Sequence, residues 1–143
     1  MSAVDTLDEA LLASYLEANI EEFKGPLTAS KFAGGQSNPT FKIDAASGSY
    51  VLRRQPPGKL LKSAHAVDRE YRVLAALADT DVPVAKVYHL CEDSDVIGSM
   101  FYIMEFCEGN VHWESSLEDI SSNQLRAKMY DEMSRVMAAI HLV

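Results

Sequence analysis

Apolar residues recur at helical spacing in the first part of the chain. This spacing predicts an amino-terminal helix whose buried side carries Leu12, Leu16, Ile20 and Phe23. Asp5 and Thr6 are of residue types that cap helix starts, while the Gly-Pro pair at positions 25–26 would end the helix. Residues 1–27 are therefore predicted to form an amino-terminal helical segment.

Between residues 28 and 110 the pattern changes to short alternating runs separated by turn residues. We expect five strands, at residues 28–33, 40–44, 50–54, 84–90 and 101–106. One helix interrupts them, beginning at Ser63 and keeping helical spacing through Val67, Tyr71, Leu74 and Ala78. This order predicts an α+β fold, in which one helix packs on a five-stranded antiparallel sheet.

A second amphipathic helix is expected near the end of the sequence, after a linker without periodicity. Its apolar stripe consists of Leu125, Met129, Met133, Val136 and Ile140. Ser121 or Ser122 would cap its start. The stripe runs almost to the last residue, so we expect an apolar side that finds no partner within the chain.

The turn after the first predicted strand is rich in small residues. It holds, in order, Gly34, Gly35, Gln36, Ser37 and Asn38. Because glycine has no Cβ and tolerates positive φ, such a tip can bring backbone N–H groups close to phosphate oxygens. An ordinary hairpin turn is the simpler explanation of the tip taken by itself.

Three residues further along could work with this tip. Period two places Val51 and Arg53 on one strand face, where they could cover an adenine ring and reach its phosphates. Glu70 shares a helix face with Leu74, so it could point toward the sheet and hold Arg53 by a charge-assisted hydrogen bond. Each charged residue also has a plainer explanation, since arginines on edge strands and glutamates on helices are commonly solvated.

Charge and composition narrow the classes of function. The chain has 143 residues, 48% of them hydrophobic, which suffices for one globular core. A net charge of −8 without a long basic cluster disfavours nucleic-acid and anionic membrane partners. No apolar run approaches the ~20 residues of a membrane span, and the acidic start lacks a signal-peptide pattern. The two cysteines lack C-x-x-C spacing, which fits a reducing, cytoplasmic compartment.

Motifs for a protein-borne metal or a nucleophile are not found in the sequence. The four histidines, at positions 65, 89, 112 and 141, show no metal-ligand spacing. No G-x-S-x-G elbow nominates a serine nucleophile. We therefore expect neither a metal site made by these side chains alone nor a hydrolase.

The order of the predicted parts is that of a kinase small lobe: glycine-bearing hairpin, strand with a cation, helix with a glutamate, two strands and a hinge. The segments FAGGQSNPTFKI, YVLRRQPPGKLLKSAHAVDREYRVLAAL, VPVAKVYHLCED and IGSMFYIMEFCEG resemble aminoglycoside phosphotransferases and choline kinase-like phosphotransferases, including the kinase-like domain fused to some acyl-CoA dehydrogenases. The resemblance covers about residues 28–143. It implies a protein kinase-like fold, with an ATP-binding amino-terminal lobe at 28–110, and at 111–143 a linker and the first helix of the large lobe.

The resemblance also implies roles for the candidate residues on the phosphate side. Residues 34–38 would form the loop over the ATP phosphates. Arg53 stands where such enzymes usually carry a phosphate-gripping lysine, and Glu70 matches the glutamate that orients this cation. Arginine keeps the charge of lysine and could clamp phosphate with two hydrogen bonds, but it is bulkier. The loop also departs from protein kinases, because it lacks their G-x-G-x-x-G pattern.

On the adenine side, the resemblance implies roles for three residues of the hinge. Met104 matches the residue at the back of the adenine pocket, and backbone groups of Glu105 and Cys107 would bond the adenine edge.

Catalytic residues of such enzymes are not found in this sequence. Phosphoryl transfer needs a base for the acceptor hydroxyl and ligands for magnesium, yet no H-x-D-x-x-x-x-N and no later D-F-G or D-x-D occurs. In the resembled family the large lobe supplies these groups. We therefore expect a chain truncated before the catalytic loop, which binds ATP and leaves the Mg²⁺ ligands to the missing lobe.

Two functions of different classes stay open. The first is the ATP-binding lobe of a phosphotransferase that moves the γ-phosphate of ATP to a hydroxyl of a small acceptor, inactive as this fragment. The alternative is a non-catalytic nucleotide-binding or protein-interaction module that self-associates through the exposed last helix. Aminoglycoside, choline-like, sugar and hydroxyacyl acceptors all fit the first, because large-lobe residues set acceptor specificity in such enzymes.

Overall fold

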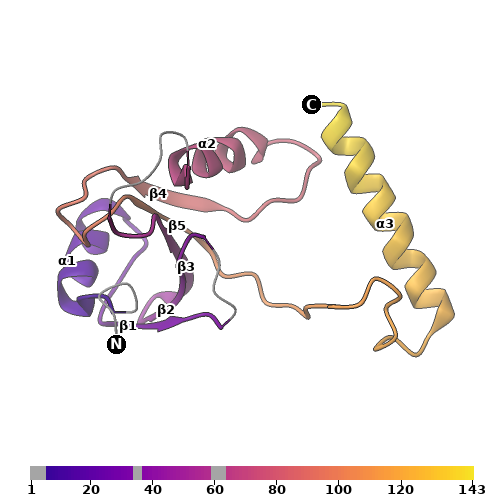
Figure 1. Ribbon diagram of the computed structural model, residues 1–143, viewed down its shortest axis with the longest axis horizontal. Helices are drawn as coiled ribbons and strands as arrows, with labels where there is room; N and C mark the ends of the chain where they lie inside the picture. The colour runs from indigo at the N-terminus through magenta and orange to yellow at the C-terminus, as the bar shows by residue number, and fades with distance from the viewer. Residues whose placement is uncertain (1–5, 34–36, 59–63) are drawn as a thin grey trace.

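The computed structural model describes residues 6–33, 37–58 and 64–143. In chain order its elements are α1 (Glu9–Asn19), β1 (Leu27–Lys31), β2 (Thr40–Ala45), β3 (Gly48–Arg54), α2 (Val67–Leu77), β4 (Val87–Cys91), β5 (Phe101–Glu105) and α3 (Asn123–His141) (Figure 1). The predicted alternation of strands with a single inserted helix is confirmed.

The five strands form one antiparallel sheet in the order β1-β2-β3-β5-β4. Hairpins join β1 to β2 and β2 to β3, and Gly48 supplies a φ of 140° where the second hairpin turns. In the centre of the sheet Phe41 lies opposite Leu52, which lies opposite Ile103. The predicted five-stranded antiparallel sheet is therefore confirmed.

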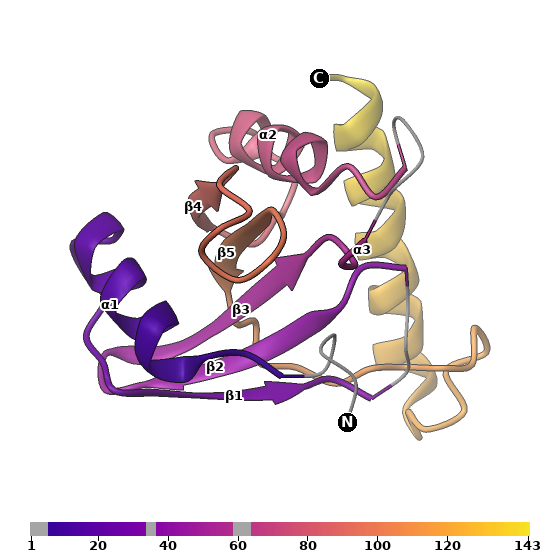
Figure 2. The ribbon, with the colours of Figure 1, turned by 60° about the vertical axis from the view of Figure 1, so that its left-hand side comes forward.

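The two faces of the sheet carry different side chains, because successive residues of a strand point to opposite sides. One face packs against α1 and forms the hydrophobic core, which holds Leu12, Leu16, Ile20, Phe23, Leu27, Phe41, Ile43, Tyr50, Leu52, Cys91, Phe101 and Ile103. Helix α2 contacts β4 and β5 (Figure 2). Residues of α1 and of the sheet thus share one core. The predicted division between residues 1–27 and 28–110 stays a prediction.

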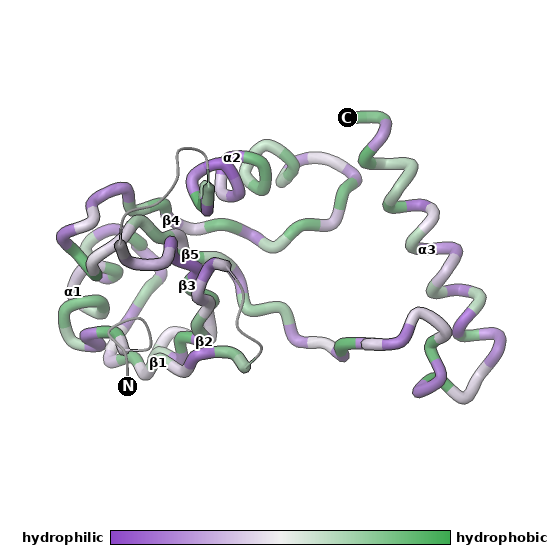
Figure 3. Tube along the Cα trace, in the orientation of Figure 1, coloured by the Kyte–Doolittle hydropathy of each residue, from purple (hydrophilic) through white to green (hydrophobic). Residues whose placement is uncertain are grey.

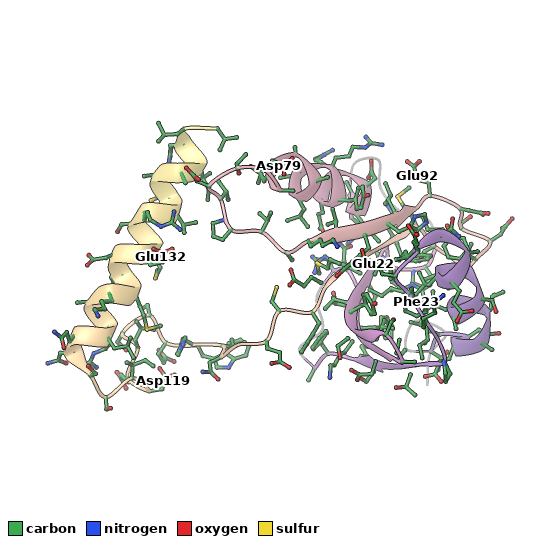
Figure 4. All side chains as sticks on the ribbon, turned by 180° about the vertical axis from the view of Figure 1, so that it is seen from behind. Glu22, Phe23, Asp79, Glu92, Asp119 and Glu132 are labelled. Carbon is green, nitrogen blue, oxygen red and sulfur yellow. The ribbon has the colours of Figure 1, made fainter. Side chains whose placement is uncertain are left out.

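The predicted start and end of the first helix were wrong. Asp8 caps α1, because its carboxylate accepts a hydrogen bond from the backbone N–H of Leu11 at 3.0 Å. Thr6 lies before this cap, and Asp5 falls outside the described residues. The helix ends at Asn19, yet Ile20 and Phe23 still reach the core, where Phe23 lies between α1 and the sheet (Figure 4).

The second helix also begins later than predicted. Ser63 lies outside the described residues, and α2 begins at Val67. His65 has a positive φ of 57°, which a right-handed helix cannot contain. The helix therefore starts only after this residue.

Some of the predicted strands were too long. The first ends at Lys31 instead of residue 33, the fourth begins at Val87 instead of residue 84, and the fifth ends at Glu105. These positions lie at the ends of strands. There the pairing with neighbouring strands, and not the local sequence, determines which residue makes the last hydrogen bond of the sheet.

Helix α3 stands apart from the sheet at the end of the linker 106–122 (Figures 1 and 4). Ser122 caps it, as predicted, by accepting from the Leu125 N–H at 3.1 Å. Apolar and polar residues alternate along its length (Figure 3). None of its residues is buried, and Met133 and Ile140 are 57% and 55% exposed. The apolar stripe thus lacks cover within the part of the chain that the structure describes.

A partly buried hydrogen bond ties α1 to β4. The hydroxyl of Tyr15 and Nε2 of His89 lie 2.9 Å apart. Burial lowers the pKa of His89 below its ordinary value of 6.5. The folded state therefore favours the neutral ring, and below about pH 6.5 the unfolded state binds more protons than the folded state. The free energy of unfolding therefore decreases as the pH falls through this range.

We predict that His89→Gln loses less stability on acidification than the unsubstituted chain, because glutamine cannot take up a proton. Urea unfolding at about pH 7 and about pH 5 measures the two free energies of unfolding. Equal losses in both chains would show that His89 does not contribute to the acid sensitivity.

Candidate functional site

A cavity of about 970 Å³ lies on the face of the sheet turned away from the α1 core. Arg53 of β3 and Tyr102 and Met104 of β5 contribute to its floor, and Glu70 of α2 contributes to its wall. Five residues predicted from the sequence line this cavity, namely Ser37, Asn38, Arg53, Glu70 and Met104. The fold thus gathers the end of the β1–β2 loop, the cation of Arg53 and the side chain of Met104 around one space.

The predicted bond between Arg53 and Glu70 is confirmed. Arg53 Nε donates to Glu70 Oε2 at 2.7 Å, and Nη2 donates to Oε1 at 3.4 Å. The two side chains are 30% and 35% exposed. This two-point contact fixes the plane of the guanidinium, because a carboxylate matches its fork geometry.

Glu70 is held from further directions. Asn38 Nδ2 donates to Oε1 at 3.1 Å, and the Tyr102 hydroxyl donates to Oε2 at 3.1 Å. Burial and the neighbouring Glu70 carboxylate raise the pKa of Tyr102, so its hydroxyl keeps the proton that it donates. Arg53 in turn donates through Nη1 to Thr40 Oγ1 at 3.3 Å. The carboxylate is therefore the centre of a network that orients Arg53.

Sequence reasoning missed four polar residues of this site, namely Thr40, His65, Arg69 and Tyr102. Tyr102 had a signal, because it lies two positions before Met104 on the same strand face. Arg69 adds a second cation to the cavity lining, and no carboxylate of the described residues forms an ion pair with it. His65 had no signal, since only its left-handed backbone brings it beside Asn38.

Other predicted site residues are not part of the cavity lining. Val51 is buried opposite Met104 without lining the cavity. Glu105 and Cys107 lie at and beyond the end of β5, and Cys107 is exposed. Gly34, Gly35 and Gln36 lie outside the described residues.

Some of the backbone hydrogen-bonding groups around Glu105 already have partners within the chain. Its N–H donates to the Lys86 carbonyl at 2.8 Å, while the Lys86 N–H donates at 3.1 Å to the Glu105 carboxylate instead of the Glu105 carbonyl. For Cys107, the N–H donates to no backbone acceptor among the described residues. A carbonyl and an N–H two residues apart thus lie at the exit from β5.

Arg54 follows Arg53 in the chain but lies in a different environment. It is 2% exposed, and its guanidinium donates to Ser99 Oγ at 2.9 Å and to the Ile97 carbonyl at 3.0 Å. Burial lowers its pKa. Arg54 therefore holds the loop between β4 and β5 and does not line the cavity.

Within the described ranges, no three His, Cys, Asp or Glu residues gather closely enough to hold a metal ion. The same ranges contain no helix long and apolar enough to cross a membrane.

A protein-family model described as the phosphotransferase enzyme family matches residues 28–143. Among curated proteins, the chain is 49% identical over 128 residues to the probable acyl-CoA dehydrogenase IBR3 of Arabidopsis thaliana, covering 86% of this chain and 15% of that protein. It is 45% identical over 119 residues to acyl-CoA dehydrogenase family member 10 of Mus musculus, covering 83% of this chain and 11% of that protein. The chain thus corresponds to a small part of each of these relatives.

Among solved structures, the chain is similar to a protein of Ralstonia eutropha described as "a putative aminoglycoside phosphotransferase". The TM-score is 0.82 at 48% sequence identity, over 96% of this chain and 39% of that one. The kinase-like fold expected from the sequence resemblance is therefore confirmed, and the chain spans part of it.

Proposed function

Because the chain belongs to the phosphotransferase enzyme family, we propose that it is the ATP-binding lobe of a small-molecule kinase. The whole protein would move the γ-phosphate of ATP to a hydroxyl of a small acceptor. The observation that carries this proposal is the Arg53–Glu70 pair in the lining of the cavity, together with Ser37 and Asn38. A cation held in a fixed orientation suits the negative charge of a triphosphate.

The hinge supports a place for the adenine ring. Met104 would lie against the ring, since it lines the cavity next to Tyr102. The Glu105 carbonyl would accept from the amino group of adenine, because the neighbouring Lys86 N–H is bonded to the Glu105 side chain. The Cys107 N–H would donate to a ring nitrogen, as it has no backbone acceptor within the described residues.

Chemistry beyond binding is not assigned to these residues. Both oxygens of Glu70 are engaged by Arg53, Asn38 and Tyr102, and the sequence contains no H-x-D-x-x-x-x-N. The described residues therefore do not fit a magnesium site. Any Mg²⁺ that accompanies ATP would be held by its phosphates and by groups other than the described residues of this chain.

Methionine methyl groups offer a direct test of where ATP binds. In a chain labelled with ¹³C at its methionine methyls, ATP should shift the Met104 signal saturably and leave Met133 and Met137 of α3 unchanged, since these two lie on the exposed helix. An unchanged Met104 signal at millimolar ATP, or equal shifts in α3, would contradict the proposal.

The exposed side of α3 favours the alternative function in one respect, self-association. We expect Met133→Gln combined with Ile140→Gln to lower the apparent mass in sedimentation velocity, because both apolar side chains are exposed. Glu132→Gln, on the same helix, is the control. If the unsubstituted chain sediments as a monomer, self-association through α3 is contradicted.

A further inference from the structure

His65 adopts a backbone conformation that is costly for a residue with a Cβ. Its φ of 57° lies in the left-handed region, at a cost of about 1 kcal/mol relative to glycine. Two hydrogen bonds to its carbonyl hold it there, from Gln55 Nε2 at 3.0 Å and from the Val67 N–H at 2.9 Å. The backbone from which the His65 side chain projects is thus fixed just before the start of α2.

The His65 ring meets Asn38, which is 6% exposed. A carboxylate only accepts hydrogen bonds, so the Asn38 atom that contacts Glu70 must be the donor Nδ2. The other amide atom of Asn38 is therefore the acceptor Oδ1. His65 Nδ1 lies 3.0 Å from this oxygen and must therefore carry the proton. A continuous series of hydrogen bonds runs from Arg53 through Glu70 and Asn38 to His65.

Asn38 also governs the residues on either side of it. Its carbonyl accepts from Thr40 Oγ1 at 3.1 Å, and Thr40 Oγ1 accepts from Arg53. Ser37, the preceding residue, lines the cavity together with Asn38. A shift of Asn38, backbone and side chain together, would therefore move both the end of the β1–β2 loop and the cation of β3.

We propose that His65 is a positioning residue that ties the end of the β1–β2 loop to the start of α2 and thereby sets the affinity of the site for the phosphate groups of the nucleotide. This inference rests on the proposed function. His65 acts through Asn38 and through the orientation that Asn38 gives to Glu70 and Ser37. The adenosine part of the ligand, placed at Met104 and the hinge, does not depend on this tie.

The choice of substitution must separate the side chain from the backbone. Alanine at position 65 would add backbone strain, because its Cβ disfavours positive φ. His65→Gly removes the ring and keeps the conformation. His65→Asn also tolerates positive φ and offers an amide donor to Asn38. His112→Gly is the matched control, since His112 bonds Asp119 in the linker and lies outside the cavity.

The test titrates ATP and adenosine separately, following the Met104 methyl signal, which detects binding in the millimolar range. We expect His65→Gly to weaken ATP binding by about tenfold, the loss of one or two hydrogen bonds, and to leave adenosine binding unchanged. His65→Asn should recover part of the ATP affinity, and His112→Gly should match the unsubstituted chain.

Different failures point to different parts of the account. Equal losses for ATP and adenosine, no loss for ATP, or no recovery in His65→Asn would overturn the positioning role while the proposed function stands. An unsubstituted chain whose Met104 signal responds to neither ligand would overturn the proposed function and this inference with it.

Discussion

Arg53→Ala should weaken ATP binding by roughly tenfold to a hundredfold, because each charge-assisted hydrogen bond is worth about 1.5–3 kcal/mol. The substitution removes the cation that Glu70 holds in the lining of the cavity. The free energy of unfolding should change much less, since the pair is about one-third exposed. Isothermal titration calorimetry with ATP measures the dissociation constant of each variant.

Arg72→Ala is the matched control for this experiment. Arg72 also belongs to α2, the helix of Glu70, but it pairs with Asp68 and Glu92 on the outside and does not line the cavity. Its removal should leave ATP affinity unchanged. Equal losses in the two variants would mean that Arg53 contributes only general positive charge.

Arg54→Met should destabilise the fold by about 3 kcal/mol, the cost of leaving buried partners without a hydrogen bond. Methionine replaces the stem of the arginine, but the Ile97 carbonyl and the Ser99 hydroxyl lose their donor. Urea unfolding measures the difference in the free energy of unfolding. A difference within about 0.5 kcal/mol would show that water replaces the guanidinium at no cost.

The same variant separates binding from folding. Arg54 does not line the cavity, so ATP affinity per folded molecule should match that of the unsubstituted chain. Arg53→Ala should therefore weaken nucleotide binding more than Arg54→Met, once the folded fraction is taken into account. A larger loss of affinity in Arg54→Met would contradict the assignment of the two arginines to opposite faces of β3.

Much of the fold could be predicted because it depends on local periodicity. The alternation of Phe41 and Ile43 with polar neighbours identifies a strand that has one core face. The Arg53–Glu70 pair also followed from periodicity, since strand and helix spacing each specify one face. The family resemblance then implied that these two faces, with Arg53 on the strand and Glu70 on the helix, lie against each other.

Features that depend on tertiary approach could not be predicted. The left-handed conformation of His65, and with it the true start of α2, needs the Gln55 and Val67 bonds to hold it. Period two separates Arg54 from the face that carries Val51 and Arg53, but its burial depends on the Ile97 and Ser99 acceptors. Sequence spacing carries no information on such partners, which lie more than forty residues away.

A calorimetric titration of the unsubstituted chain with ATP, set beside a titration with adenosine, tests the central claim most directly. The account predicts saturable binding of ATP and weaker binding of adenosine, because in the proposed function Arg53 and the end of the β1–β2 loop would meet the phosphates while Met104 and the hinge would meet the ring. Adenosine binding as tightly as ATP, or no binding of ATP at millimolar concentration, would contradict it.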